Sequence, residues 1–261
     1  KVSVTGTESL MMAATLADGE TIIDNAALEP EVVDLAVCLR GMGAKIKGDG
    51  STRIVIEGVK ALHGYEHTVV ADRIETGSYL IAGIATHGLI RCTHALPESL
   101  DVLLQKLKQA NALIEIDGTS IIADMRNRKI MPVDIVTAPH PGFPTDMQAQ
   151  MMAMMAIAEG RSKVTETVFE NRFMHVVELN RMGASITAEG RSAVVDGPAK
   201  LTGCQVRATD LRAGAAMILA GLVAEGTTEI CDIYHIDRGY EEIVAKLQGL
   251  GADIKRVGGN D

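Results

Sequence analysis

The sequence repeats one pattern four times, and this periodicity restricts the folds open to it more than any other feature. Each copy predicts a helix of small apolar residues, a helix-ending glycine, a strand, a polar corner and a second helix. The helix-ending glycines are Gly19, Gly88, Gly160 and Gly226. They lie 69, 72 and 66 positions apart, so each copy is a supersecondary unit of nearly constant length.

A second turn, after the second helix of each copy, leads into another strand. The residues at this turn are Gly43, Asn111, Gly183 and Gly251. Glycine and asparagine are the residues that accept the left-handed backbone conformation just past a helix. We therefore expect all four turns to share one geometry, with Asn111 in the role that glycine has in the other copies.

Segments rich in valine and isoleucine complete each copy as strands. Examples are "KVSVTG", "TRIVIEGV", "TSIIADM" and "SAVVDGP". The first helix of every copy is apolar on most faces, as in "MMAMMAIA", and such a helix is typically buried. The sequence thus predicts an α/β (α+β) fold of repeated βαβαββ units, with the helices inside and the sheets outside.

Composition supports a packed core and excludes several classes of protein. Hydrophobic residues are 47% of the 261 residues, and charged residues are 23%. The net charge of −9 argues against a nucleic-acid partner, because such surfaces need an excess of Lys and Arg. No apolar run reaches the roughly 18 residues of a membrane helix, so we expect no membrane partner.

The four cysteines and seven histidines lack the spacing of a metal site or a redox pair. We expect no metal, and we expect the cysteines to be reduced core thiols in a cytoplasmic protein. They are Cys38, Cys92, Cys204 and Cys231. The chain opens on "KVSVTGTESL", without methionine and apparently within a strand, so we expect an N-terminal part to precede it.

Comparison of the copies locates the residues that could carry chemistry. Fourteen residues before each helix-ending glycine, at the start of the first helix, stand Thr5, Ile74, Asp146 and Arg212. Twelve residues after each glycine, at the polar corner, stand Glu31, Leu100, Arg172 and Arg238. Guanidinium groups beside helix starts suit phosphate and carboxylate groups. The last two copies therefore predict an anion pocket, with surface salt bridges as the alternative.

Asp146 follows an unusually stiff loop, "TAPHPGFPT", with three prolines within six residues. A stiff loop suits a general base, which must be held within hydrogen-bond reach of its proton. The alternative is that Asp146 is an ordinary helix N-cap. Asp210 has a similar alternative, in which it orders a helix start and neighbouring arginines. The methionines that follow Asp146 are expected to fill the core.

Four motifs resemble one family of enzymes. The stretches "APHPGFPTDMQAQ", "TETVFENRFMH", "ATDLRAG" and "IYHIDRGYE" together resemble the UDP-N-acetylglucosamine 1-carboxyvinyltransferase (MurA) family of enolpyruvyl transferases. The resemblance runs through the whole chain. It implies an inside-out α/β prism of two domains, each of three units. Residues 1–70 would then be the last unit of the first domain, with its N-terminal units missing, and residues 71–261 would be the second domain.

The resemblance also implies an activity, without metal or organic cofactor. The family transfers the enolpyruvyl group of phosphoenolpyruvate to the 3-hydroxyl of UDP-N-acetylglucosamine, the first committed step of peptidoglycan synthesis. By this resemblance Asp146 is the base for that hydroxyl, Arg172, Arg212 and Arg238 serve phosphoenolpyruvate, and Asp210 supports them. The implied sugar-nucleotide contacts are Lys1, Val2, Ser3, Val4, Asp146 and Val168.

The family's Lys-Asn pair and its mobile loop with a reactive cysteine have no counterpart here, so we expect the chain alone to be inactive. Three alternatives remain open. One is another enolpyruvyl transferase, such as 3-phosphoshikimate 1-carboxyvinyltransferase, or a phosphate cyclase. Another is a non-catalytic repeat scaffold, such as a ring-shaped clamp. The third is a fragment that keeps only sugar-nucleotide affinity.

Overall fold

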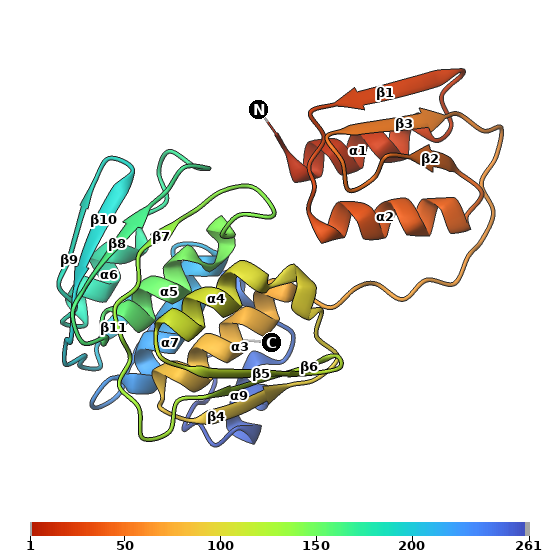
Figure 1. Ribbon diagram of the computed structural model, residues 1–261. Coiled ribbons are helices and arrows are strands. Elements are labelled where there is room, and N and C mark those ends of the chain that lie inside the picture. The colour runs from red at the N-terminus through yellow and green to blue at the C-terminus, as the bar shows by residue number, and fades with distance from the viewer. Residues whose placement is uncertain (1, 259–261) are drawn as a thin grey trace. The chain divides into compact units, whose positions relative to one another are not determined.

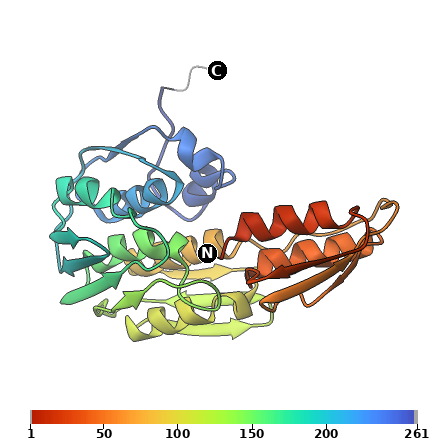
Figure 2. The same ribbon diagram turned by 90° about the horizontal axis from the view of Figure 1, so that it is seen from above.

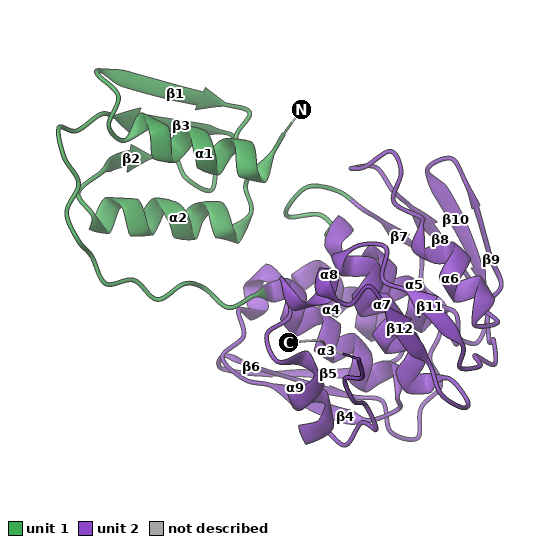
Figure 3. Cartoon of the chain, turned by 180° about the vertical axis from the view of Figure 1, so that it is seen from behind, with its two compact units in different colours: residues 1–72, 138–144 green, residues 73–137, 145–261 purple. Residues whose placement is uncertain are grey.

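The computed structural model describes residues 2–258, which divide into two units (Figure 3). Unit 1 comprises residues 1–72 with 138–144, and unit 2 comprises residues 73–137 with 145–261. The division after Asp72 separates the first repeat from the other three, but the proline loop before Asp146 is grouped with unit 1. That unit 1 belongs to a larger domain stays a prediction.

Unit 1 contains two helices packed against a three-stranded antiparallel sheet of order β1-β3-β2 (Figure 1). Its elements are α1 (Val4–Ala14), β1 (Glu20–Asp24), α2 (Pro30–Gly41), β2 (Lys45–Lys47) and β3 (Arg53–Glu57). Alternate residues of β3, Ile54 and Ile56, are fully buried. They pack with Met11 of α1 and Val32 of α2, so the apolar face of the sheet meets both helices.

The first segment of unit 1 corrects a prediction, because "KVSVTG" does not form a strand. Ser3 is instead the N-cap of α1, and its hydroxyl accepts a hydrogen bond from Gly6 N at 3.1 Å. The Thr7 hydroxyl donates to Ser3 O at 2.8 Å. These local bonds satisfy the start of a helix, and they override the strand preference of two valines.

Unit 2 holds the other three copies. The second copy comprises α3 (Arg73–Ala85), β4 (Leu89–Cys92), η1 (Pro97–Ser99), α4 (Asp101–Gln109), β5 (Leu113–Asp117) and β6 (Ser120–Asp124). The third comprises β7 (Ile135–Val136), η2 (Thr145–Met147), α5 (Gln148–Met155), β8 (Arg161–Thr165), α6 (His175–Arg181), β9 (Ile186–Glu189) and β10 (Ser192–Asp196). The fourth comprises β11 (Gln205–Arg207), α7 (Leu211–Val223), β12 (Glu229–Cys231), α8 (Tyr234–Asp237) and α9 (Ile243–Gly249).

The sheets confirm a common unit but correct its predicted regularity. Sheet order is β4-β6-β5 in the second copy, β7-β8-β10-β9 in the third and β11-β12 in the fourth. Only the third copy has every predicted strand. Among the described residues, the first two copies lack the leading strand, and residues 252–258 form no strand after α9. Ile254 packs instead against the apolar cluster around α7 and α9.

The first helix of each copy in unit 2 lies inside and the sheets lie outside, as predicted, whereas the second helices are more exposed, α9 above all. Helices α3, α5 and α7 pack against one another, with the β4-β6-β5 sheet beside α3 and the β8-β10-β9 sheet beside α5 (Figures 1 and 2). All eight residues of α5 are buried. Five methionines, predicted as core, are fully buried: Met147, Met151, Met152, Met154 and Met155. This interior holds the helix starts that carry the predicted site.

The turn after the second helix has the predicted geometry in all four copies. Its φ angles are 100° at Gly43, 78° at Asn111, 100° at Gly183 and 96° at Gly251. In each copy the next residue, an alanine, donates its N–H to a leucine carbonyl five residues earlier, as Ala112 does to Leu107 at 3.0 Å. This is the bond pattern of a Schellman cap, so Asn111 replaces glycine without changing the turn.

Candidate active site

The predicted helix-start positions are structurally equivalent. Thr5, Ile74, Asp146 and Arg212 are each the second residue of α1, α3, η2 and α7. The proline loop ahead of Asp146 is closed by hydrogen bonds from Ala138 N to Phe143 O at 2.9 Å and from Gly142 N to Pro139 O at 2.8 Å. A loop closed in this way delivers Thr145 and Asp146 to η2 with little backbone freedom.

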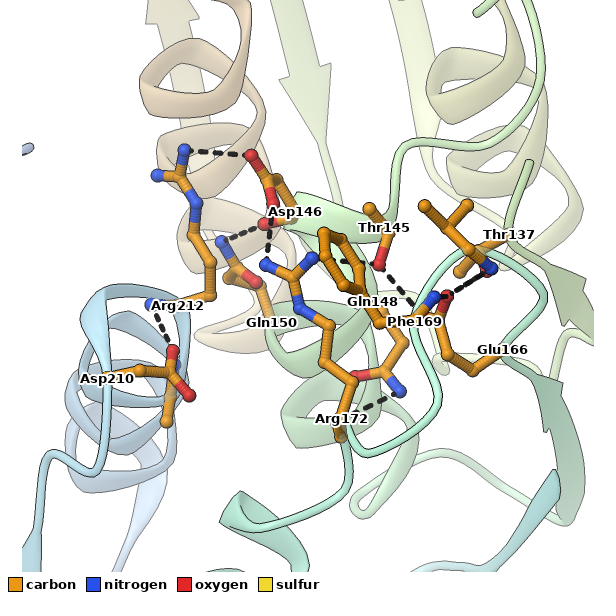
Figure 4. A network of polar contacts seen from close by, with 12 residues as sticks. Thr137, Thr145, Asp146, Gln148, Gln150, Glu166, Phe169, Arg172, Asp210 and Arg212 are labelled. Carbon is orange, nitrogen blue, oxygen red and sulfur yellow. Dashed lines mark hydrogen bonds and ion pairs between the residues drawn. The ribbon is translucent and has the colours of Figure 1, made fainter. Parts of the chain in front are cut away.

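Asp146 lies between two arginines from different copies (Figure 4). Its Oδ1 is 2.6 Å from Arg172 Nη2, and its Oδ2 is 3.1 Å from Arg212 Nη2. The Asp146 side chain is 39% exposed, and those of Arg172 and Arg212 are 20% and 16% exposed. One carboxylate thus joins two half-buried guanidinium groups while remaining open to solvent.

One alternative for Asp146 is wrong. The residue at the N-cap of α5 is Met147, without a side-chain cap bond, so the carboxylate of Asp146 is not the cap of that helix. The salt-bridge alternative is met by Arg172 and Arg212, which both form an ion pair with Asp146, and the anion pocket stays a prediction. The equivalent helix-start residues Asp146 and Arg212 are thus joined with a corner residue, Arg172, in one cluster.

Electrostatics of the cluster favour the charged forms. Burial, the largest single influence on Asp146, raises its pKa, but Arg212 and Arg172 together outweigh it and leave the pKa below its ordinary value. For Arg212, burial is again the largest single influence and lowers the pKa. Asp146 and a hydrogen bond with Tyr240 outweigh it, so the pKa of Arg212 lies above its ordinary value. Asp146 is therefore an anion at neutral pH.

Asp210 acts on the helix that carries Arg212. It is the N-cap of α7, and its Oδ1 accepts from Arg212 N at 2.8 Å and from Ala213 N at 2.9 Å. It fixes the helix start, as the alternative for this residue predicts, and within residues 2–258 its carboxylate forms no ion pair with Arg172 or Arg212. Its contribution is to the backbone position of Arg212.

Arg172 is held on two further sides. Its Nη1 donates to Thr145 Oγ1 at 3.0 Å. Its guanidinium carbon lies 4.6 Å from the centre of the Phe169 ring, a cation–π contact. Val168, the predicted sugar-nucleotide contact, is half-buried in the same loop as Phe169. The position of the Arg172 guanidinium thus depends on the loop that contains Val168 and Phe169.

Among residues 2–258, none of the other predicted site residues takes part in the two ion pairs of Asp146. Arg238 is exposed at the C-cap of α8, and among residues 2–258 it makes no ion pair with Asp146. Val2, Ser3 and Val4 belong to unit 1, where Ser3 caps α1 and Val4 is its first residue. Their predicted strand is a helix start. Lys1 lies outside the described residues.

Several polar residues of the site were not singled out from the sequence. Gln150 Nε2 donates to Asp146 O at 2.9 Å and lies 3.3 Å from Tyr240 Oη. Glu166 is buried at the end of β8 beside Thr145 and Thr137. The sequence did contain a signal for these residues. Glutamines within the methionine-rich helix and an acid within "TETVF" are polar residues in apolar segments, and buried polar residues need hydrogen-bond partners.

Metals, membranes and thiols add little to the site. Within residues 2–258, no group of three or more His, Cys, Asp or Glu side chains could hold a metal ion. No helix in that range is long and apolar enough to cross a membrane. The four cysteines are free thiols, but they are half-buried rather than in the core as predicted.

The comparisons with known proteins identify the family. Residues 1–247 match the family described as EPSP synthase (3-phosphoshikimate 1-carboxyvinyltransferase). The chain belongs to the EPSP synthase family. Its fold is the α/β fold of enolpyruvyl transferases. The structure of the enolpyruvyl transferase NikO from Streptomyces tendae matches with a TM-score of 0.85 and 30% sequence identity. The match covers 97% of this chain and 60% of the NikO chain. EPSP synthase from Acinetobacter baumannii matches at a TM-score of 0.70 and 18% identity, and covers 97% of this chain and 62% of its own.

Two relatives within the EPSP synthase family are much closer in sequence. UDP-N-acetylglucosamine 1-carboxyvinyltransferase from Pseudoalteromonas atlantica is 57% identical over 256 residues, covering 98% of this chain. UDP-N-acetylglucosamine 1-carboxyvinyltransferase 2 from Carboxydothermus hydrogenoformans is also 57% identical over 98% of the chain. The chain spans 61% of the length of each of these relatives.

Proposed function

We propose that the protein containing these units transfers the enolpyruvyl group of phosphoenolpyruvate to the 3-hydroxyl of UDP-N-acetylglucosamine. The observation that carries the proposal is the pair of ion pairs that Asp146 forms with Arg172 and Arg212. The chain that contains them is 57% identical to proteins named for this reaction. The reaction belongs to peptidoglycan synthesis, and we place the protein in the cytoplasm. Its partners are these two substrates, without nucleic acid, membrane or cofactor.

The charge arrangement suggests how Asp146 becomes a base. Without ligand, two cations hold its pKa low, which makes it a weak proton acceptor. A phosphate or carboxylate group bound by Arg172 and Arg212 would offset their positive charge. The pKa of Asp146 would then rise, and the group would become better able to accept the proton of the sugar hydroxyl.

The arginines have a second role in this proposal. Phosphoenolpyruvate is a compact anion, and guanidinium groups bind phosphate and carboxylate with paired donors. Asp146, Thr145 and Asp210 already position the two arginines. The guanidinium groups therefore need little reorganisation as the charge on the substrate changes during addition and elimination. We assign Arg238 to the same anion and Val168, with residues 1–4, to the sugar nucleotide.

The exposed face of α1 supports the proposal that further units of the same protein pack on unit 1. By position in the repeat, α1 corresponds to the buried helices α3, α5 and α7. It nevertheless exposes the large apolar side chains of Leu10 and Met12, and Leu16, two residues beyond its end, is also exposed. Such side chains are typical of a surface that another element covers. We propose that residues 1–72 complete a domain with such units, and that the 261 residues alone are inactive.

The test is phosphate release by the full-length protein, supplied with phosphoenolpyruvate and either UDP-N-acetylglucosamine or shikimate 3-phosphate. The proposal predicts turnover with the sugar nucleotide only. Turnover with shikimate 3-phosphate would assign the protein to the other enolpyruvyl transferases, and no turnover with either would favour a scaffold.

A further inference from the structure

Glu166 is a buried acid that accepts hydrogen bonds from four donors. Its side chain is 1% exposed and follows β8. Oε1 accepts from Thr137 Oγ1 at 2.8 Å, from Val168 N at 2.8 Å and from Phe169 N at 3.0 Å. Oε2 accepts from Thr145 Oγ1 at 2.8 Å. Strand, loop and site helix thus meet at one carboxyl group (Figure 4).

The direction of these bonds is determined by the neighbouring groups. Thr145 Oγ1 accepts from Arg172 Nη1 at 3.0 Å, so its own hydrogen points to Glu166. Thr137 Oγ1 accepts from Thr167 N at 2.9 Å, so its hydrogen also points to Glu166. Backbone N–H groups can only donate. A carboxylate accepts at both oxygens, whereas a glutamine would place an NH₂ group against a donor.

We propose that Glu166 is a positioning residue, which holds the Arg172 guanidinium against Asp146 and shapes the loop that carries Val168. It reaches Arg172 by two routes. One is the Thr145 hydroxyl, which also fixes the residue before Asp146. The other is Phe169, whose N–H it binds and whose ring lies 4.6 Å from the guanidinium carbon. The consequence for substrates rests on the proposed function.

The structure explains why such a link is needed. Arg172 and Asp146 are 26 positions apart and come from separate segments, so no local backbone geometry sets their distance. Without the link, neither the distance of the Arg172 guanidinium from Asp146 nor its plane would be fixed, and it could turn away from the acid. Misplacement of a positioned group by about 1 Å can reduce a rate about 10²-fold, so the expected loss is in the reaction more than in folding.

The test uses a matched pair of variants in the full-length protein. Thr145→Val removes the hydroxyl that relays Glu166 to Arg172 and keeps the shape, while Thr145→Ser keeps the hydroxyl. Glu166→Gln keeps the size of the acid but not its acceptor pattern. We expect Thr145→Val and Glu166→Gln to lower kcat/KM about 10- to 100-fold, and Thr145→Ser to stay within about threefold of wild type.

Ser162→Ala is the control for simple loss of a buried hydroxyl. Ser162 lies in β8, the strand that leads to Glu166, and is fully buried. Its hydroxyl accepts from Val133 N at 3.1 Å, so it is not one of the four donors to Glu166. We expect this variant to lose thermal stability while its kcat/KM falls less than about threefold. If Glu166 and Thr145 only stabilised the fold, kcat/KM would instead fall in step with Tm in all of these variants.

The pH dependence of kcat/KM gives a second readout. An Arg172 that no longer holds Asp146 would let the pKa of that acid rise, so the acid limb of the pH profile should move to higher pH in Thr145→Val but not in Ser162→Ala. The proposal would be overturned if the acid limb did not move and the loss of kcat/KM followed the loss of Tm across the variants. Equal kcat/KM values for Thr145→Val and Thr145→Ser would also overturn it.

Failure of the proposed function is distinguishable from failure of this inference. If the wild type releases no phosphate with either acceptor, the proposed function is wrong, and crystal structures of wild type and Glu166→Gln then decide the inference. The inference predicts an Arg172 guanidinium turned away from Asp146 in the variant. An unchanged contact near 2.6 Å would refute it.

Discussion

His175 provides a prediction whose size follows from its surroundings. It is the first residue of α6, its side chain is 3% exposed, and its Nε2 lies 3.3 Å from Met152 Sδ. Burial, the main cause, and the nearby charge of Arg172 lower its pKa from 6.5 to about 4, although Asp210 acts in the opposite direction. The folded protein therefore keeps this imidazole neutral at neutral pH.

Stability should consequently fall as the solution is acidified. Below about pH 6.5 the unfolded chain binds a proton at this residue, whereas the folded protein does not bind it until about pH 4. The stability is fully present above the unfolded pKa and is lost as the pH falls toward the folded pKa. At 1.36 kcal/mol per pH unit, the loss is about 2 kcal/mol at pH 5 and about 3 kcal/mol at pH 4.

Urea unfolding followed by far-ultraviolet circular dichroism, at about pH 7.5 and about pH 5, measures this loss. In His175→Leu, which cannot titrate, the difference in unfolding free energy between the two pH values should shrink by about 2 kcal/mol. His94→Asn alters an exposed histidine of the same unit and serves as the control, so it should leave the difference as in wild type. An identical pH difference in His175→Leu and wild type would refute the reasoning.

Substitutions at three further positions test other parts of the fold by thermal unfolding. Asp210→Ala removes the cap of α7 and should lower stability by about 1 kcal/mol, whereas Asp210→Asn should retain most of it. Gly214→Ala places a methyl group 2.5 Å from Ile236 Cγ1 and should lower stability by about 1–3 kcal/mol; an unchanged Tm would mean that the helices are not so closely packed. Asn111→Gly should be neutral or stabilising, but Asn111→Ala should lower stability by about 1 kcal/mol because φ is 78°.

The repeat made much of the fold predictable. The repeat period, the turn residues and the apolar first helices can be recognised from the local sequence. The left-handed turn at Asn111 and the burial of α5 could therefore be predicted. Strands need partners, and the sequence does not state which partners are present. For this reason the segment before α1 and the segment after α9 were wrongly predicted as strands.

The site was predictable only in part, for a similar reason. Repeat alignment found Asp146 and Arg212 at equivalent helix starts and Arg172 at a polar corner, and these positions come together in the folded chain. It placed Arg238 at an equivalent corner, where the structure leaves this side chain exposed at the C-cap of α8. Glu166 escaped notice because its importance comes from four partners spread from Thr137 to Phe169, which only the folded chain brings together.

The measurement that tests the central claim most directly is phosphate release by the full-length protein and by its Asp146→Asn variant. Both receive saturating phosphoenolpyruvate and UDP-N-acetylglucosamine. Asparagine keeps the shape of the side chain and can still accept from an arginine, but it cannot accept the sugar proton. The account predicts turnover by the wild type and a loss of about 10²- to 10⁴-fold in the variant. A variant within about threefold of wild type would contradict it.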